Sequence, residues 1–192
     1  MLSSINPLGE RTRNQGFWVT VSWYLLGSLM GGLVLGSVSG AVGWLLPSGT
    51  WRAIAVIVVC AVGAGLDAAG RQPPSIHRQV NENWLAKYRG WVYGLGFGFQ
   101  LGLGVVTIVT TASVYTTIAL AVLSGSVLFG AVVGAIFGVA RAVAIFLVAR
   151  ADDPATLRGV MRRLQDGLPR ARLLAIGSQA VAAVVAVGYL VR

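Results

Sequence analysis

Four polar side chains interrupt the apolar stretches of this sequence and are the residues most able to do chemistry there. They are Gln100, Thr107, Asp67 and Arg141. Polar and ionisable residues at membrane depth are costly in lipid, and they mark ion or substrate paths by default. A threonine hydroxyl can instead bond to the carbonyls of its own helix. If these stretches cross a bilayer, the sequence predicts a path for a small solute or ion along the four residues, with Gln100 the strongest position.

Asp67 and Arg141 are predicted to lie at a similar depth, because each precedes a basic stretch of the chain. An arginine inside an apolar run can extend its guanidinium toward the membrane interface. We therefore expect the two side chains to pair across the bundle. The pair would act either as a structural latch, which we favour, or as an ion-coupling site. Gln179, in the last apolar run, is expected to form a hydrogen bond between helices.

The residue sets that catalysis requires are not found in this sequence. With one cysteine, Cys60, and one histidine, His77, one copy of the chain cannot build a His/Cys metal cluster or a paired-thiol relay. We find no Ser/His/Asp set, no usefully spaced pair of carboxylates and no phosphate loop. The glycines of 94–104 follow no predicted strand, so they do not match a nucleotide-binding fingerprint. We expect neither an enzyme nor a bound cofactor.

Glycine recurs at every fourth position in several apolar segments. The rows include Gly94, Gly98 and Gly102, then Gly130, Gly134 and Gly138, and earlier Gly32, Gly36 and Gly40. This spacing leaves a groove along one helix face into which a second helix can pack closely. We interpret the rows as packing within one protomer, with a dimer face or a solute path as alternatives. The glycine density of 94–104 also predicts a helix break near Gln100, since glycine weakens helices.

Composition and charge placement indicate a protein of the lipid bilayer. The chain is 56% hydrophobic and 11% charged, whereas a soluble domain carries about 25% charged residues. Most of the 15 Lys and Arg residues fall before residue 16, in 70–90 or in 150–172. Cytoplasmic loops of membrane proteins carry this excess. We assign the net charge of +9 to these loops and to anionic inner-leaflet lipid, and we expect no nucleic-acid partner.

The apolar runs predict an all-α membrane bundle of about five spans, with the N-terminus cytoplasmic and the C-terminus outside. The spans are 16–46, 51–69, 90–122, 125–149 and 173–191. Because a straight span needs about 20 residues, the first and third are long enough to tilt or break. Two spans within 90–149 keep both basic loops on one side; three short spans, giving six in all, remain the alternative.

Two interfacial helices are predicted on the cytoplasmic side, within 76–88 and 154–168. In the second, Asp153 is the expected N-cap and Pro154 fits the first turn. Leu157, Val160, Met161, Leu164 and Leu168 share one face, so we expect this helix to lie on the inner leaflet. The whole chain, 1–192, is predicted to form one membrane domain, with a weak internal repeat of 16–69 and 90–149.

The glycine-rich segments 93–104 and 130–138, set in paired long and return spans, resemble the cytochrome c biogenesis transmembrane family of thiol electron transporters. The resemblance implies a helical bundle with broken spans. Members of that family use a cysteine next to prolines in each repeat, and this chain has neither there. Thr107 stands where a reactive residue is expected. The resemblance therefore implies a fold, and the redox activity does not carry over.

Together these patterns predict a small multi-pass protein of the inner or plasma membrane. Our main interpretation is a transporter-like protein that moves a small solute or ion through a glycine-rich helix bundle. The alternative is a non-catalytic membrane subunit or assembly factor that packs against partner helices of a larger envelope or redox complex. Either interpretation is compatible with a homo-oligomer or with a partner membrane subunit.

Overall fold

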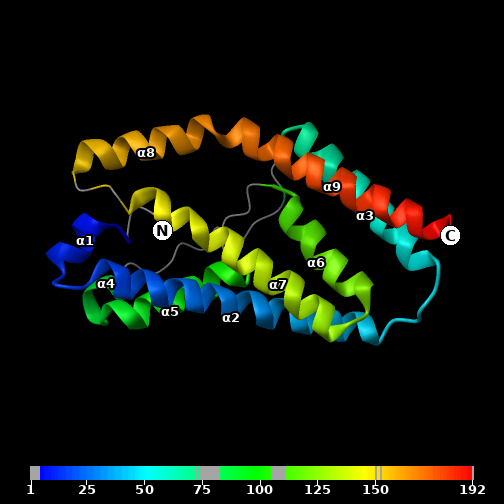
Figure 1. Cartoon of the computed structure of the whole chain (residues 1–192), viewed down its shortest axis with the longest axis horizontal. Coiled ribbons are helices and arrows are strands. Elements are labelled where there is room, and N and C mark those ends of the chain that lie inside the picture. The colour runs from blue at the N-terminus through cyan, green and yellow to red at the C-terminus, as the bar shows by residue number, and fades with distance from the viewer. Residues whose placement is uncertain are drawn as a thin grey trace.

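The computed structural model describes residues 5–71, 73, 83–104, 111–149, 151 and 153–191. All regular secondary structure in these residues is helical, and Figure 1 shows the arrangement. The helices are α1 (Pro7–Thr12), α2 (Phe17–Trp44), α3 (Trp51–Ala68), α4 (Asn83–Lys87), α5 (Gly90–Gly102), α6 (Ser113–Ser124), α7 (Val127–Ala142), the 3-10 helix η1 (Val143–Val148), α8 (Pro154–Asp166) and α9 (Leu168–Leu190). The predicted all-α class is confirmed.

Among the described residues, four helical segments are long and apolar enough to cross a membrane. They are Phe17–Trp44, Trp51–Ala68, Val127–Val148 and Leu168–Gly188. These segments fit a multi-pass membrane protein. The fifth predicted span, 90–122, is divided between α5 and the short apolar helix α6, so a five-span protein stays a prediction.

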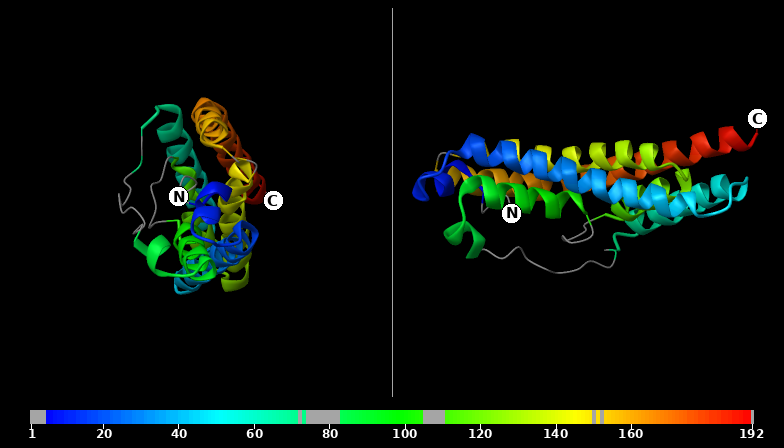
Figure 2. Two further views of the ribbon diagram at one scale, coloured as in Figure 1. Left: turned by 90° about the vertical axis from the view of Figure 1, so that its left-hand side faces the viewer. Right: turned by 90° about the horizontal axis from the view of Figure 1, so that it is seen from below.

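Helix α2 is the centre of the bundle and runs along most of its length (Figures 1 and 2). Helix α7 packs along it, α5 contacts its first half, and α6 contacts its last turns. Helices α3 and α9 form a second pair, which meets the rest of the bundle chiefly through α6. This division places α6 at the junction between the two groups of helices.

The glycine rows lie where α2 meets its neighbours within the same chain. A side chain added at Gly134 or Gly130 would overlap the carbonyl oxygen of Gly32 or Gly36 on α2. On the other side, Gly94, Gly98 and Gly102 face the carbonyl oxygens of Thr20, Tyr24 and Ser28. Ser28 also donates from Oγ to the carbonyl of Gly138 across 2.7 Å. Backbone-to-backbone packing of this kind is what small residues at regular spacing permit in lipid.

Helix α8 forms as predicted, but its apolar face packs against protein. Asp153 caps it by accepting hydrogen bonds from the backbone N–H groups of Ala155 and Thr156, each at 2.8 Å. Leu157, Val160 and Met161 pack on a buried cluster that contains Ile5, Ile145 and Val148. Helix η1 supplies part of this hydrophobic surface, and the placement of α8 on the inner leaflet stays a prediction. Of the other predicted interfacial helix, the described part is α4, where Trp84 stacks on Phe97.

Candidate functional site

The apolar segment 90–122 is broken into two helices beside the middle of α2. Helix α5 ends at Gly102, and Gly104 adopts a left-handed φ of +68° that favours glycine. Helix α6 begins at Ser113, with Ala112 as its N-cap. Leu103 lies against Gly31 on α2, so the break is deep in the bundle. Helix ends expose unpaired carbonyl and N–H groups, and inside a membrane the protein itself must satisfy them.

Asp67 binds the free N-terminal end of α6. Its Oδ1 accepts a hydrogen bond from the backbone N–H of Ala112 at 2.7 Å, and its Oδ2 accepts one from Gln179 Nε2 at 2.9 Å. Asp67 is 1% exposed and Gln179 is 3% exposed. An anion at a helix N-terminus is stabilised by the partial positive charge of the helix dipole. One carboxylate therefore joins α3, α6 and α9.

Arg141 binds the backbone on the other side of the break, at the end of α5. Its Nη1 donates to the carbonyl oxygen of Gly104 at 3.3 Å, just past the C-terminal end of α5. The guanidinium also lies over the ring of Phe137, 5.3 Å from the centroid. A cation is favoured at a carbonyl end of a helix for the same reason that an anion is favoured at an N–H end. The broken segment thus has an acidic residue at one free end and a basic residue at the other.

The predicted pairing of Asp67 with Arg141 is wrong, because each bonds to a different end of the break. The depth of Asp67 and Arg141 in the membrane could be estimated from the sequence. The backbone groups that bind these two side chains instead become available only because the helix is broken. The predicted interhelical hydrogen bond of Gln179 is confirmed, and its partner is Asp67.

The remaining predicted path residues do not join this cluster in the described structure. Gln100 is half-buried on α5, and its side chain takes part in none of the side-chain hydrogen bonds found among the described residues. Thr107 lies outside the described residues. The structure instead brings Thr116 and Gly63 close to Gln179, the partner of Asp67. The candidate site therefore lies at the junction of α3, α6 and α9 and not on α5.

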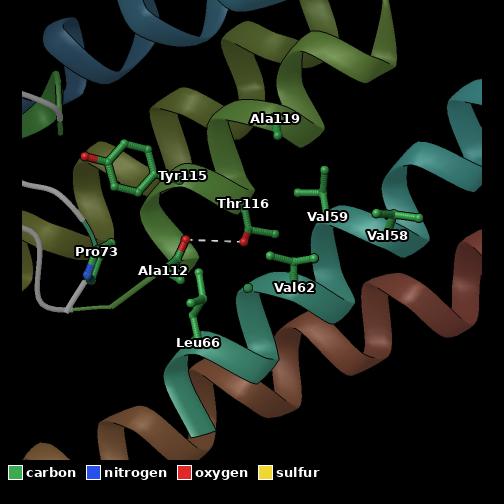
Figure 3. Close-up of a pocket in the computed structure, with 10 residues that line it drawn as sticks. Val58, Val59, Val62, Leu66, Pro73, Ala112, Tyr115, Thr116 and Ala119 are labelled. Atoms are coloured by element: carbon green, nitrogen blue, oxygen red, sulfur yellow. Dashed lines mark hydrogen bonds between the residues drawn. The ribbon is translucent and has the colours of Figure 1, made fainter. Parts of the chain in front are cut away.

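At this junction two side-chain oxygens converge on Gly63. Gln179 Oε1 and Thr116 Oγ1 each lie 2.5 Å from the position that a Cβ on Gly63 would occupy. Gln179 Oε1 is buried and has no hydrogen-bond partner among the described residues. Thr116 Oγ1 donates to the carbonyl of Ala112 at 3.2 Å. An apolar cleft of about 480 Å³ adjoins Gly63 and Thr116; Figure 3 shows it between α3 and α6.

A second buried polar cluster, which the sequence analysis missed, holds α1 against the starts of α2 and α5. Glu10 is fully buried, pairs with Arg13 at 2.7 Å and accepts hydrogen bonds from the hydroxyls of Thr20 and Tyr93. Burial alone would lower the pKa of Arg13, but its bond and charge interaction with Glu10 raise that pKa above its ordinary value. The available signal was that Glu10 is the sole acidic residue before Asp67.

Comparison with known proteins finds relatives that are named methylamine utilization protein MauF. The one from Methylophilus methylotrophus is 35% identical over 140 residues, covering 70% of this chain and 48% of that protein. Those from Paracoccus versutus and Methylobacillus flagellatus are 31% and 30% identical, each over 73% of this chain and over 54% and 52% of their own lengths. This chain spans about half the length of the curated relatives it matches.

No protein-family model matches the chain. No solved structure matches it either. The relatives that are found are methylamine utilization proteins, so the resemblance to the cytochrome c biogenesis family is wrong. It rested on glycine spacing, and glycine rows recur wherever membrane helices pack closely.

Proposed function

We propose that this protein is a non-catalytic membrane subunit or assembly factor that serves methylamine utilization. The observation that carries the proposal is the similarity to MauF proteins, which extends over about seven-tenths of this chain. The partner would be another membrane subunit or a complex at the membrane surface. A transporter of a small solute, our main interpretation of the sequence, has less support from these relatives.

The packing of the bundle also favours a structural role. Glycine backbones of α2 and α7 lie in direct contact, as do those of α2 and α5. A pocket between α2, α6 and α7 has a volume of about 10 Å³, which is about the least that one water molecule needs. Asp67 and Arg141 each occupy one end of the broken helix. Close packing of this kind suits a protein that presents fixed helix faces to a partner.

For the topology we propose five traverses of the inner or plasma membrane, with α5 and α6 sharing one of them. Helix α1 and the last turn of α9 lie at opposite ends of the bundle (Figure 1), which supports an odd number. The basic stretches would face the cytoplasm and its anionic lipid.

The test is deletion of the encoding gene in the organism that carries it, followed by two measurements. The first is growth on methylamine compared with growth on another carbon source. The second is the initial uptake of radiolabelled methylamine by intact cells. An assembly role predicts that growth on methylamine is lost while initial uptake is kept, and that a Gln100→Leu copy restores growth. Loss of initial uptake, with no rescue by Gln100→Leu, would instead establish the transporter.

A further inference from the structure

The apolar cleft between α3 and α6 has room for a ligand (Figure 3). Its volume of about 480 Å³ is in the range of about 300–1,000 Å³ that ligand sites have. On α3 it extends from Val58 to Leu66, which at 1.5 Å per residue is about 12 Å. Apart from the hydroxyl groups of Tyr115 and Thr116, the side chains that line it are hydrocarbon. The part of a ligand that lies in this cleft must therefore be apolar.

The dimensions of the cleft favour a hydrocarbon chain over a helix of another protein. A helix with its side chains is about 10–12 Å in diameter, so a length of 12 Å fills about 900 Å³ or more, roughly twice the volume of the cleft. A single hydrocarbon chain is far narrower. Val58 and Val62, on the wall of the cleft, are 54% and 57% exposed. Because α3 is long and apolar enough to span a membrane, the cleft would open toward lipid acyl chains.

The end of α3 places positive charge at one end of the cleft. Gly70 has a left-handed φ of +68°, and the backbone N–H of Arg71 donates to the carbonyl of Leu66 at 3.1 Å, as in the Schellman motif that ends many helices. This turn brings Pro73 onto the cleft and leaves Arg71, two residues earlier, exposed. Arg172 Nη1, from α9, lies 3.3 Å from the position that a Cβ on Gly70 would occupy. Two guanidinium groups therefore lie near this end of the cleft.

These two guanidinium groups are available to an anion. Among the residues that the structure describes, neither group forms an ion pair with a carboxylate; the pair that is found joins Arg13 to Glu10. Asp67, in the last turn of α3, is 1% exposed and directs its oxygens to Ala112 and Gln179. Arginine binds phosphate oxygens through paired N–H donors. The charge at this end therefore complements a phosphate attached to an apolar chain.

We propose that an anionic phospholipid of the surrounding bilayer binds here, with one acyl chain in the cleft between α3 and α6 and its phosphate at Arg71 and Arg172. Basic pockets between membrane helices bind anionic head groups in this way. The bound lipid would stabilise the contact of α3 with α6, because a ligand that binds the folded state stabilises it. This inference rests on the geometry of the cleft and goes beyond the proposed role in assembly.

The test is native mass spectrometry of the purified, delipidated full chain, titrated with dioleoyl phosphatidylglycerol or with dioleoyl phosphatidylcholine. The two lipids have the same acyl chains, and only the first carries a net negative charge. We expect one phosphatidylglycerol per chain, bound about thirtyfold more tightly than phosphatidylcholine because of the two arginines. Absence of saturable binding, or equal affinity for the two lipids, would overturn the proposal. The assay has no growth or assembly readout, so its failure is distinct from failure of the proposed function.

A first pair of variants locates the head group. Arg71→Gln combined with Arg172→Gln should lower the affinity for phosphatidylglycerol about thirtyfold, to that for phosphatidylcholine. Arg158→Gln combined with Arg162→Gln removes the same charge from exposed positions of α8 and should leave the affinity unchanged. If the first double variant binds phosphatidylglycerol as tightly as the parent protein, the phosphate lies elsewhere and the assignment is wrong.

A second pair locates the acyl chain. Val62→Trp places a large side chain at the cleft and should weaken the binding of both lipids about tenfold or more, because it displaces methylene groups from apolar contact. The control is Val184→Trp, at an exposed valine of α9 that does not line the cleft. Equal binding by these two variants would contradict the proposed place of the chain. A dimer of the parent protein that Val62→Trp abolishes, with no lipid adduct, would assign the cleft to a second copy and overturn the proposal.

Discussion

Replacing Asp67 tests whether its carboxylate holds the broken helix to α3 and α9. In Asp67→Ala, the backbone N–H of Ala112 and the amide nitrogen of Gln179 both lose their acceptor in a buried place. Each buried donor left unpaired costs about 1–3 kcal/mol, so we expect a loss of about 2–6 kcal/mol in the free energy of unfolding.

Asp67→Asn should cost much less. The asparagine carbonyl can still accept from the N–H of Ala112, and the amide of Gln179 can turn over so that its oxygen accepts from the asparagine nitrogen. The change that remains is the loss of negative charge at the start of α6, worth about 0.3–2 kcal/mol. The order of stability is therefore parent, then Asp67→Asn, then Asp67→Ala.

The assay is reversible unfolding in mixed micelles, followed by far-ultraviolet circular dichroism as the fraction of denaturing detergent is raised. Asp166→Ala is the matched control, because it removes an exposed carboxylate at the end of α8 and is expected to change stability by less than about 0.5 kcal/mol. The reasoning is refuted if Asp67→Ala is as stable as the control, or if Asp67→Asn is as damaging as Asp67→Ala.

Three further predictions concern the glycine packing, the buried Glu10 cluster and the N-terminal cap of α8. Gly134→Leu places a side chain against the backbone of α2 and should lower the free energy of unfolding by about 1–3 kcal/mol or more in the same assay. In the control Gly177→Leu, an added Cβ meets nothing within 4 Å, and the loss should be less than about 0.5 kcal/mol. Equal losses in the two variants would contradict the packing of α7 on α2. Tyr93→Phe removes one of the hydroxyl donors to buried Glu10 and should cost about 1–3 kcal/mol, and a neutral result would show that the cluster does not bear on stability. The hydrogen bonds from Thr156 lower the pKa of Asp153, so the stabilisation by this cap is present above the unfolded pKa of about 3.9 and is lost as pH falls through the lower folded pKa. The amide resonances of the first turn of α8 should therefore show fraying of the helix in acid. An unchanged spectrum of these residues would contradict the cap.

Local signals allowed part of this fold to be predicted from the sequence. The cap of α8 needs only Asp153 and Pro154 beside a periodic apolar face, so the start of that helix was predictable. The helical class and the apolar spans followed from composition and from the placement of basic residues. Long-range contacts were not accessible in this way. The apolar face of α8 packs on Ile5, which lies far away in the sequence, and on Val148 of the preceding helix η1. No local sequence pattern indicates these packing partners.

The break in 90–122 shows where sequence reasoning reached its limit. Glycine density predicted a break near Gln100, and α5 ends close to it, at Gly102. The row of Gly94 and Gly98 lies against the backbone of α2, and this packing offsets the low helix preference of glycine. The helix ends just past the last of these contacts, before Gly104 turns into the left-handed region. The partners of Asp67 could not be predicted, because they depend on backbone groups that this break exposes.

The most direct test of the account is a nuclear magnetic resonance measurement on the backbone amide of Ala112. If Asp67 holds the free end of α6, this amide proton should exchange slowly with solvent and resonate downfield in the parent protein. It should lose both properties in Asp67→Ala and keep slow exchange in Asp67→Asn. An amide at residue 112 that exchanges rapidly in the parent protein, or that is unaffected by Asp67→Ala, would contradict the assignment of Asp67 as the residue that binds the start of α6.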